Sequence, residues 1–322
     1  MSMKKIAVLT SGGDAPGMNA AIRAVVRSAL YKGMDVCGIY RGYNGLINGD
    51  LLPMDLRTVS DIIHRGGTML YTARSAEFLT LEGQQKAAAT CRANGIEGVV
   101  CIGGDGTFRG AQDLARQGIN CVGIPCTIDN DIACCEYTIG YDTALNTCME
   151  MIDKLRDTAQ SHDRCSVVEV MGRHAGYLAL NVGIAVGATT IVVPEVPFDF
   201  ERDVLGRIKK TASTGKKHFI IIVAEGVGGV VEMAKQVQEV TGIESRPTIL
   251  GHVQRGGSPS VRDRVLASHM GNTAVQLLAE GKTNRVVALQ SNRIVDFEIA
   301  EALQMKKSFD FDMFRIAHEI SI

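Results

Sequence analysis

Two carboxylates and a hydroxyl follow a short apolar run at residues 121–124: Thr127, Asp129 and Asp131. In an α/β sheet, the end of a strand is where ligands bind. One carboxylate there can take a proton from a hydroxyl nucleophile during phosphoryl transfer, while a second helps to hold a metal. Asp and Asn also favour turns, so this segment alone fits a surface turn equally well.

Two glycine-rich loops also follow apolar runs and lead into helical patterns. They read TSGGDAPGMN from residue 10 and GGDGT from residue 103. Glycine lets a backbone approach phosphate closely, and the N–H groups at a helix start bind anions. Asp105 is placed to organise Mg²⁺ on nucleotide phosphates, directly or through water. The first loop fits neither the dinucleotide fingerprint nor the P-loop pattern, and a tight turn without a ligand is its alternative reading.

Arginines occur in two further glycine-containing loops. Arg173 lies in MGRHAG from residue 171, and His252 and Arg255 lie in GHVQRGG from residue 251. Guanidinium groups bind phosphate through two parallel hydrogen bonds, although a single arginine in a loop is usually just solvated. Two such loops in one chain predict a reaction centre with two phosphorylated ligands. Three more arginines are candidates for it: Arg74, Arg164 and Arg246.

The composition limits the classes of protein. A chain of 322 residues suggests about two domains, and 46% hydrophobic content is enough for buried cores. A net charge of −1 argues against sequence-independent nucleic-acid binding. The start of the sequence lacks the apolar core of a signal peptide, and residues 178–193 read as a packed helix and a buried strand rather than a membrane span. We expect a soluble, cytoplasmic protein without a membrane partner.

The nine cysteines form no C-x-x-C pair. Several, such as Cys101, Cys121 and Cys165, lie in strand-like apolar runs, which predicts small buried side chains in a reducing compartment. Cys134 and Cys135 are the exception, because they fall in an expected loop.

Short apolar runs alternate with helical spacing along the chain. The runs cover residues 6–9, 99–102, 121–124, 167–170, 191–193 and 219–224, and helical stripes cover 18–29 and 145–155. Strands that are apolar throughout and alternate with helices predict parallel sheets covered on both faces. The fold class is therefore α/β. Breaks near Gly140 and near the turn at residues 255–259 would make one domain discontinuous.

Taken together, the motifs resemble the bacterial ATP-dependent 6-phosphofructokinase family. The carriers are TSGGDAPGMNAAIRAVVR, GGDGTFRGA, TIDNDI, MGRHAGYLAL and LGHVQRGGSP, and the resemblance runs from Lys4 to about Gly281. It implies transfer of the ATP γ-phosphate to the 1-hydroxyl of fructose 6-phosphate, with Mg²⁺, in a homotetramer. It also implies two Rossmann-like three-layer domains with mostly parallel sheets. Residues 1–139 plus 257–305 would bind ATP, and residues 140–256 plus 306–322 the sugar phosphate.

The resemblance implies a role for each matching residue. Asp129 is the expected base, with Thr127 and Asp131 beside it and Arg173 as a further catalytic residue. ATP contacts fall on Gly13, Arg74, Ser75, Gly104, Asp105, Gly106 and Thr107, with Asp105 at the metal. The sugar-phosphate site takes Thr127, Asp129, Asp131, Met171, Gly172, Arg173, Glu225, His252 and Arg255, and Arg164 and Arg246 reach into a neighbouring subunit's site.

An effector site for ADP or phosphoenolpyruvate is also implied. Its basic residues match Arg23, Arg27, Arg156, Lys216, Lys217 and His218. The alternative interpretation of Arg23 and Arg27 is a pair of exposed residues one helical turn apart, without a ligand. Leu56, Thr189 and Thr214 replace charged residues common in the family, so we expect reduced or absent effector regulation, because lost charges weaken anion binding.

Three alternatives stay open. A pyrophosphate-dependent phosphofructokinase is one, although such relatives carry Lys at position 126 and Asp at position 106, where this chain has Cys126 and Gly106. An NAD or lipid kinase, which shares GGDGT, is the second. A catalytically silent sugar-phosphate sensor is the third, and the intact Asp105 and Asp129 argue against it.

Overall fold

The chain folds into two compact units. The computed structural model describes residues 3–321. The first unit comprises Met1–Ile128, Ile132–Thr143 and Arg255–Lys307, and the second comprises Asp129–Asp131, Ala144–Gln254 and Ser308–Ile322. These bounds lie a few residues from the expected breaks at 139/140, 256/257 and 305/306, and they group the acidic loop with the second unit.

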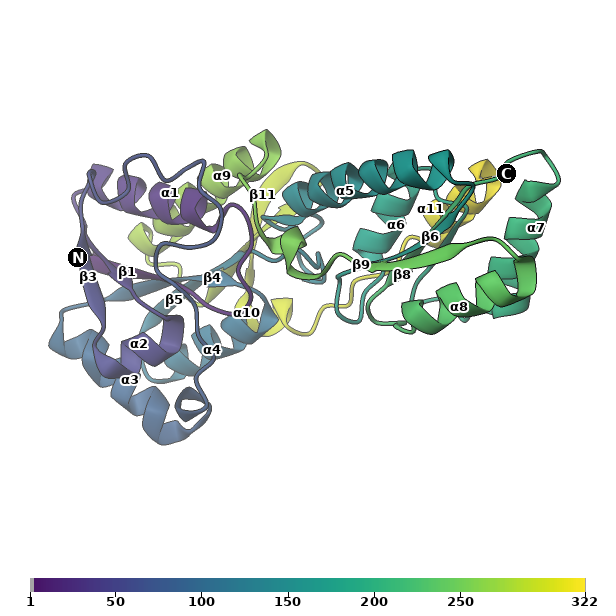
Figure 1. Ribbon diagram of the computed structural model, residues 1–322. Helices are drawn as coiled ribbons and strands as arrows, with labels where there is room; N and C mark the ends of the chain where they lie inside the picture. Colours follow the sequence, from purple (N-terminus) through teal and green to yellow (C-terminus); the bar gives the residue numbers. More distant parts are fainter. Residues whose placement is uncertain (1–2, 322) are drawn as a thin grey trace. The chain divides into compact units, whose positions relative to one another are not determined.

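The first unit is a seven-stranded sheet with helices on both faces (Figure 1). The strand order is β11-β10-β5-β4-β1-β2-β3; β2–β3 and β10–β11 are antiparallel and the other pairs are parallel. Helices α1 and α9 lie on one face, and α2, α3 and α4 on the other. The strands are β1 (Lys5–Thr10), β2 (Asp35–Ile39), β3 (Leu51–Met54), β4 (Gly98–Gly103), β5 (Asn120–Pro125), β10 (Arg285–Gln290) and β11 (Arg293–Glu298). The helices are α1 (Met18–Tyr31), α2 (Gly42–Asn48), α3 (Leu81–Ala93), α4 (Asp105–Arg116), α9 (Val261–Ala279) and α10 (Ile299–Ala302).

The second unit is a four-stranded, all-parallel sheet in the order β7-β8-β6-β9. Its strands are β6 (Cys165–Val170), β7 (Thr190–Val192), β8 (Phe219–Ala224) and β9 (Ser245–Ile249). The helices are α5 (Tyr141–Ser161), α6 (Tyr177–Ala185), α7 (Gly206–Ala212), α8 (Val230–Thr241) and α11 (Phe311–Ile320), and α5 begins within the first unit.

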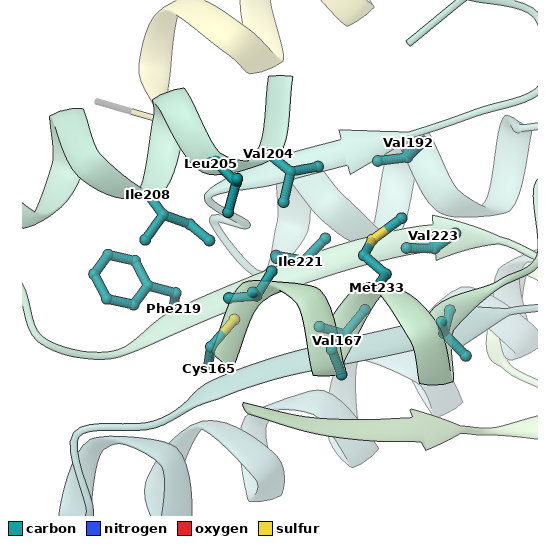
Figure 2. Packing of buried hydrophobic residues seen from close by; sticks show 13 residues of the cluster. Cys165, Val167, Val192, Val204, Leu205, Ile208, Phe219, Ile221, Val223 and Met233 are labelled. Carbon is teal, nitrogen blue, oxygen red and sulfur yellow. The ribbon is translucent and has the colours of Figure 1, made fainter. Parts of the chain in front are cut away.

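Burial on both sheet faces explains the continuous apolar runs. All six residues of β8 are buried. Phe219, Ile221 and Val223 point to one face, where they pack with Ile208 of α7 and Met233 of α8 (Figure 2). The α/β class with mostly parallel sheets is confirmed, and each predicted apolar run forms a strand, the run at 191–193 being shifted by one residue to Thr190–Val192.

The antiparallel edge strands were not singled out by the sequence pattern. Strand β3 carries Pro53, which lacks the N–H that a central strand would need, so it suits an edge. Strands β10 and β11 form a hairpin whose two turn residues, Ser291 and Asn292, both have positive φ, of 47° and 60°. That geometry matches the twist of antiparallel strands.

All nine cysteines are buried and none forms a disulfide. The predicted burial of Cys101, Cys121 and Cys165 is confirmed. Cys134 and Cys135 do lie in a loop, but at 1% and 0% exposure they are as buried as the others. Within residues 3–321, none of the helices combines the length and the apolar character needed to cross a membrane.

Candidate active site

The two predicted phosphate loops lie side by side in the first unit. Strands β1 and β4 are neighbours, and the chain continues from β1 to β2 on one side and from β4 to β5 on the other. Their carboxyl ends therefore flank a topological switch point, where ligands bind in open α/β sheets. The Ser11 N–H donates to the Ile102 carbonyl at 3.0 Å, and the Thr107 hydroxyl donates to the Ser11 carbonyl at 3.0 Å. The two loops thus form one hydrogen-bonded structure.

The first loop depends on glycine at two positions. Gly12 and Gly17 have φ of 89° and 109°, in the left-handed region that side chains disfavour. A Cβ on Gly13 would lie 2.6 Å from a guanidinium nitrogen of Arg255. That same guanidinium donates to the Asp14 carbonyl at 3.2 Å. Arg255, expected in the sugar-phosphate site, therefore contacts the loop expected to bind ATP.

The second loop leads directly into α4. Gly104 precedes the helix and Asp105 is its first residue, so the backbone N–H groups of a helix start and one partly exposed carboxylate lie together. A Cβ on Gly106 would have nothing within 4 Å, which leaves open space beside this helix end. Such a helix start is suited to phosphate.

The donor set around Asp105 fits magnesium bound together with a nucleotide. Within the described part of the chain, no group of three or more His, Cys, Asp and Glu side chains is arranged to hold a metal ion. Mg²⁺ usually binds through one or two carboxylates plus waters and substrate phosphates rather than in an all-protein cage. A single carboxylate at a phosphate-binding helix end is therefore sufficient.

Arg74 and Ser75 lie on the segment that follows β3. Arg74 is exposed, whereas the Ser75 hydroxyl accepts a hydrogen bond from the Phe78 N–H at 3.2 Å. Thr72 on the same segment donates to the Gly12 carbonyl at 2.7 Å, which fixes this segment beside the first glycine loop.

The acidic loop, residues 127–131, follows β5, and its start is fixed by hydrogen bonds. The Thr127 N–H donates to the Ile139 carbonyl at 3.0 Å, and the Thr138 hydroxyl donates to the Thr127 carbonyl at 2.7 Å. Asp129 is 3% exposed, and the residue after it, Asn130, has a φ of 50°. Asn suits this turn, since it adopts a left-handed φ more readily than most side chains do.

In the second unit, predicted substrate residues follow two adjacent strands. Met171, Gly172 and Arg173 come after β6, and Glu225 comes after β8. The Arg173 N–H donates to the Glu225 carboxylate, and the Glu225 N–H donates to the Val170 carbonyl. The Arg173 side chain is exposed, so its guanidinium is available to a ligand.

Gln254 organises this site, and sequence reasoning did not single it out. It is fully buried, and its side-chain oxygen accepts from the Met171 N–H at 3.0 Å and from the Cys148 thiol at 3.1 Å. Its amide nitrogen donates to the Gly251 carbonyl at 3.0 Å. The signal that could have revealed it is a polar residue between His252 and Arg255.

Arg164 and Arg246 lie at the opposite end of the same sheet. Arg164 immediately precedes β6, and Arg246 pairs in register with Ser166 near the start of that strand. Both form ion pairs with Glu244, at 2.8 and 2.5 Å, and hydrogen bonds from Arg164 and then Arg246 lower the pKa of its carboxyl. They cannot therefore join the Met171 and Glu225 site of the same chain.

The predicted effector residues fall into two groups. Arg23 and Arg27 share one face of α1 in the first unit, half-buried and exposed respectively. In the second unit, burial and then the Arg156 charge lower the pKa of Lys216, and burial, Lys216 and Arg156 lower that of His218. Lys217 lies 3.9 Å from Asp163. The second group thus concentrates positive charge.

The three substituted positions carry uncharged side chains. Thr189 is 1% exposed, and its hydroxyl has no hydrogen-bond partner among residues 3–321. Leu56 is 52% exposed, and the Thr214 hydroxyl donates to the Thr211 carbonyl at 2.7 Å.

Fold and loops define an α/β protein whose two glycine loops meet at a topological switch point, and comparison with known proteins makes the class specific. A family model described as phosphofructokinase matches residues 5–278. The chain belongs to the phosphofructokinase family. This confirms the family expected from the sequence motifs.

Relatives of known name match along their full length. The chain is 56% identical over 320 residues to the ATP-dependent 6-phosphofructokinase of Bacillus cytotoxicus, covering 99% of this chain and all of that protein. It is 57% identical over 319 residues to ATP-dependent 6-phosphofructokinase 1 of Clostridium perfringens, again covering all of it.

Solved structures share the fold. Phosphofructokinase of Saccharomyces cerevisiae superposes with a TM-score of 0.88 at 38% identity; 99% of this chain is covered, and it spans 48% of the yeast chain. A pyrophosphate-dependent phosphofructokinase of Marinobacter aquaeolei gives a TM-score of 0.86 at 21% identity, covering 99% of this chain and 91% of that one. The latter similarity concerns the fold alone.

Proposed function

We propose that this chain is an ATP-dependent 6-phosphofructokinase, which transfers the ATP γ-phosphate to the 1-hydroxyl of fructose 6-phosphate in glycolysis. The products are fructose 1,6-bisphosphate and ADP. The observation that carries the proposal is the pair of hydrogen-bonded glycine loops at the β1/β4 switch point, in a chain that matches enzymes of this name from end to end. A cytoplasmic location suits this role.

In this proposal the first unit binds ATP. The backbone of the glycine loops and the start of α4 receive the phosphates, and Arg74 adds a positive charge. When bound, Mg²⁺ neutralises phosphate charge, and Asp105 is the residue that would hold it. The nucleotide contacts are Gly13, Arg74, Ser75, Gly104, Asp105, Gly106 and Thr107.

The chemistry proposed for the acidic loop is proton removal. Asp129 accepts the proton of the sugar hydroxyl as that oxygen attacks phosphorus, and Asp131 and Thr127 support it. Phosphoryl transfer needs placement and charge neutralisation more than covalent catalysis. The near-complete burial of Asp129 excludes bulk water from the base, and Arg173 offers positive charge to the transferred group.

The sugar phosphate is assigned to the loops at the carboxyl ends of β6, β8 and β9. Its contacts are Met171, Gly172, Arg173, Glu225, His252 and Arg255, beside Thr127, Asp129 and Asp131. Arg164 and Arg246 serve the site of a second copy of the chain, which is supported by their place at the far end of β6. This requires an oligomer, and we propose a homotetramer.

ATP rather than pyrophosphate is the proposed phosphoryl donor. Open space at Gly106 leaves room for an adenylate-bearing chain, and burial holds the pKa of the Cys126 thiol well above its usual range, so position 126 offers no charge to a small anion. A coupled assay with fructose 6-phosphate compares the donors directly. Turnover with ATP is expected, and turnover only with pyrophosphate would overturn the assignment.

Effector regulation is proposed to be weak. Arg23, Arg27, Arg156, Lys216, Lys217 and His218 supply cations for ADP or phosphoenolpyruvate, but the uncharged side chains at positions 56, 189 and 214 reduce the binding charge. The same assay run with increasing ADP is expected to show little change in the sugar-phosphate saturation curve. A sigmoidal curve that ADP makes hyperbolic would contradict this.

A further inference from the structure

A buried carboxylate on α9 holds the turn that precedes α5. Asp263 lies in the first turn of α9 and is 0% exposed. Its oxygens accept hydrogen bonds from the Gly140 N–H at 2.9 Å, the Thr143 N–H at 2.9 Å and the Thr143 hydroxyl at 2.5 Å. A buried acid normally survives only with such partners. Asp263 therefore caps the start of α5 from a different helix.

The turn that Asp263 holds is tightly confined. Gly140 has a φ of 99°, and a Cβ on it would lie 2.7 Å from the Ala15 Cβ. The Ser260 N–H also donates to the Thr143 hydroxyl at 2.9 Å, so this hydroxyl is fixed from two sides. Without the carboxylate, two backbone N–H groups and one hydroxyl would lose their acceptor in the protein interior.

This turn is joined to the acidic loop by the residues just before it. Ile139 forms a bridge with Cys126: its N–H donates to the Pro125 carbonyl at 3.1 Å, and its carbonyl accepts from the Thr127 N–H at 3.0 Å. Thr138, which is fully buried, donates to the Thr127 carbonyl at 2.7 Å. The N–H and the carbonyl of Thr127 are thus hydrogen-bonded to Ile139 and Thr138. Gly140, which follows Ile139, donates its N–H to Asp263.

We propose that Asp263 is a positioning residue for phosphoryl transfer, which sets the placement of Thr127 and of the acidic loop that starts two residues later. The inference rests on the proposed function. Asp263 is too buried to touch either substrate, so it acts through Gly140, Thr143 and the Cys126–Ile139 bridge. Its loss should lower kcat while leaving the binding of both substrates nearly unchanged.

The test compares Asp263→Asn with two variants of its partner. Asparagine keeps the volume but turns one accepting oxygen into an amide nitrogen. Thr143→Val removes the donated hydroxyl, and Thr143→Ser at the same position retains it. We expect kcat to fall about 10- to 100-fold in Asp263→Asn and to fall measurably in Thr143→Val, because small misplacements of reacting groups are costly. Thr143→Ser should restore the wild-type rate, and KM for both substrates should change less than about threefold.

Hydrogen exchange supplies a readout independent of turnover. Peptides covering residues 125–128 should exchange about tenfold faster in Asp263→Asn and in Thr143→Val than in the wild type or Thr143→Ser. A kcat within about twofold of wild type, a loss confined to KM, or unchanged exchange at 125–128 would each overturn the inference. If Asp263→Asn does not fold, the comparison of Thr143→Val with Thr143→Ser tests the inference instead. A wild-type chain without activity on ATP and fructose 6-phosphate would refute the proposed function, while the exchange experiment would still test the connection.

Discussion

The position of Arg246 leads to a prediction about subunits. Arg246 is in register with Ser166, and the predicted substrate residue Met171 lies five residues further along the same chain direction. At roughly 3.3 Å per strand residue, Ser166 and Met171 are about 17 Å apart along the strand. That distance is beyond the reach of the Arg246 side chain. If Arg246 contacts the sugar phosphate, it must do so in the site of another copy of the chain.

Two single variants define the expected effects. Arg246→Ala removes a charge-assisted contact to phosphate, worth about 1.5–3 kcal/mol, so KM for fructose 6-phosphate should rise roughly 10- to 160-fold. Within its own chain this change leaves Glu244 paired with Arg164 at 2.8 Å. Asp129→Asn removes the proposed base but leaves Arg246 intact.

Mixing the two variants distinguishes a shared site from a site within one chain. In randomly mixed oligomers with a two-fold interface, about a quarter of the sites combine an intact Asp129 from one chain with an intact Arg246 from its neighbour. Co-refolded protein assayed at low fructose 6-phosphate should therefore regain about a quarter of the wild-type rate. Activity that stays at the sum of the separate variants would refute the reasoning, because no single chain carries both residues.

Three further predictions concern single residues. Asp129→Asn alone should lower kcat about 10²- to 10⁴-fold in the coupled assay, and near-normal turnover would contradict its role as base. Gln254→Leu leaves the Met171 N–H without its acceptor, so the free energy of unfolding should fall by about 1–3 kcal/mol and KM for the sugar phosphate should rise; an unchanged denaturant midpoint would count against this. Burial, followed by the Arg207 charge, lowers the pKa of His318 below 6.5 in the folded state, so the unfolded chain binds more protons and stability is lost as pH falls through that region. The melting temperature should therefore drop less between about pH 7.5 and 5.5 in His318→Gln than in the wild type, and equal drops would exclude the histidine as a cause.

Much of the fold could be predicted because it depends on local patterns. Apolar runs such as residues 99–102 and 219–224 became strands buried on both faces, and the helical stripes at residues 18–29 and 145–155 lie within α1 and α5. The edge strands were missed, because β3 has only four residues with Pro53 among them, and the apolar residues of β11 are interrupted by Asp296. The glycine loops were recognisable because glycine is required for two reasons: Gly12 and Gly17 have left-handed φ values that favour glycine, and a Cβ on Gly103 would lie 2.3 Å from the Ser11 carbonyl oxygen.

The sequence by itself determined the family and the types of residue available for chemistry, since motifs of this kind are contiguous and their order is specific. Tertiary structure alone decided which of them meet. It placed Arg255 against Gly13, separated Arg246 from Met171 by the length of β6, and connected Asp263 to Thr127 through the Gly140 N–H and the Cys126–Ile139 bridge. The physical reason is that hydrogen bonds and strand pairings between distant segments depend on the path of the whole chain, which no local spacing records.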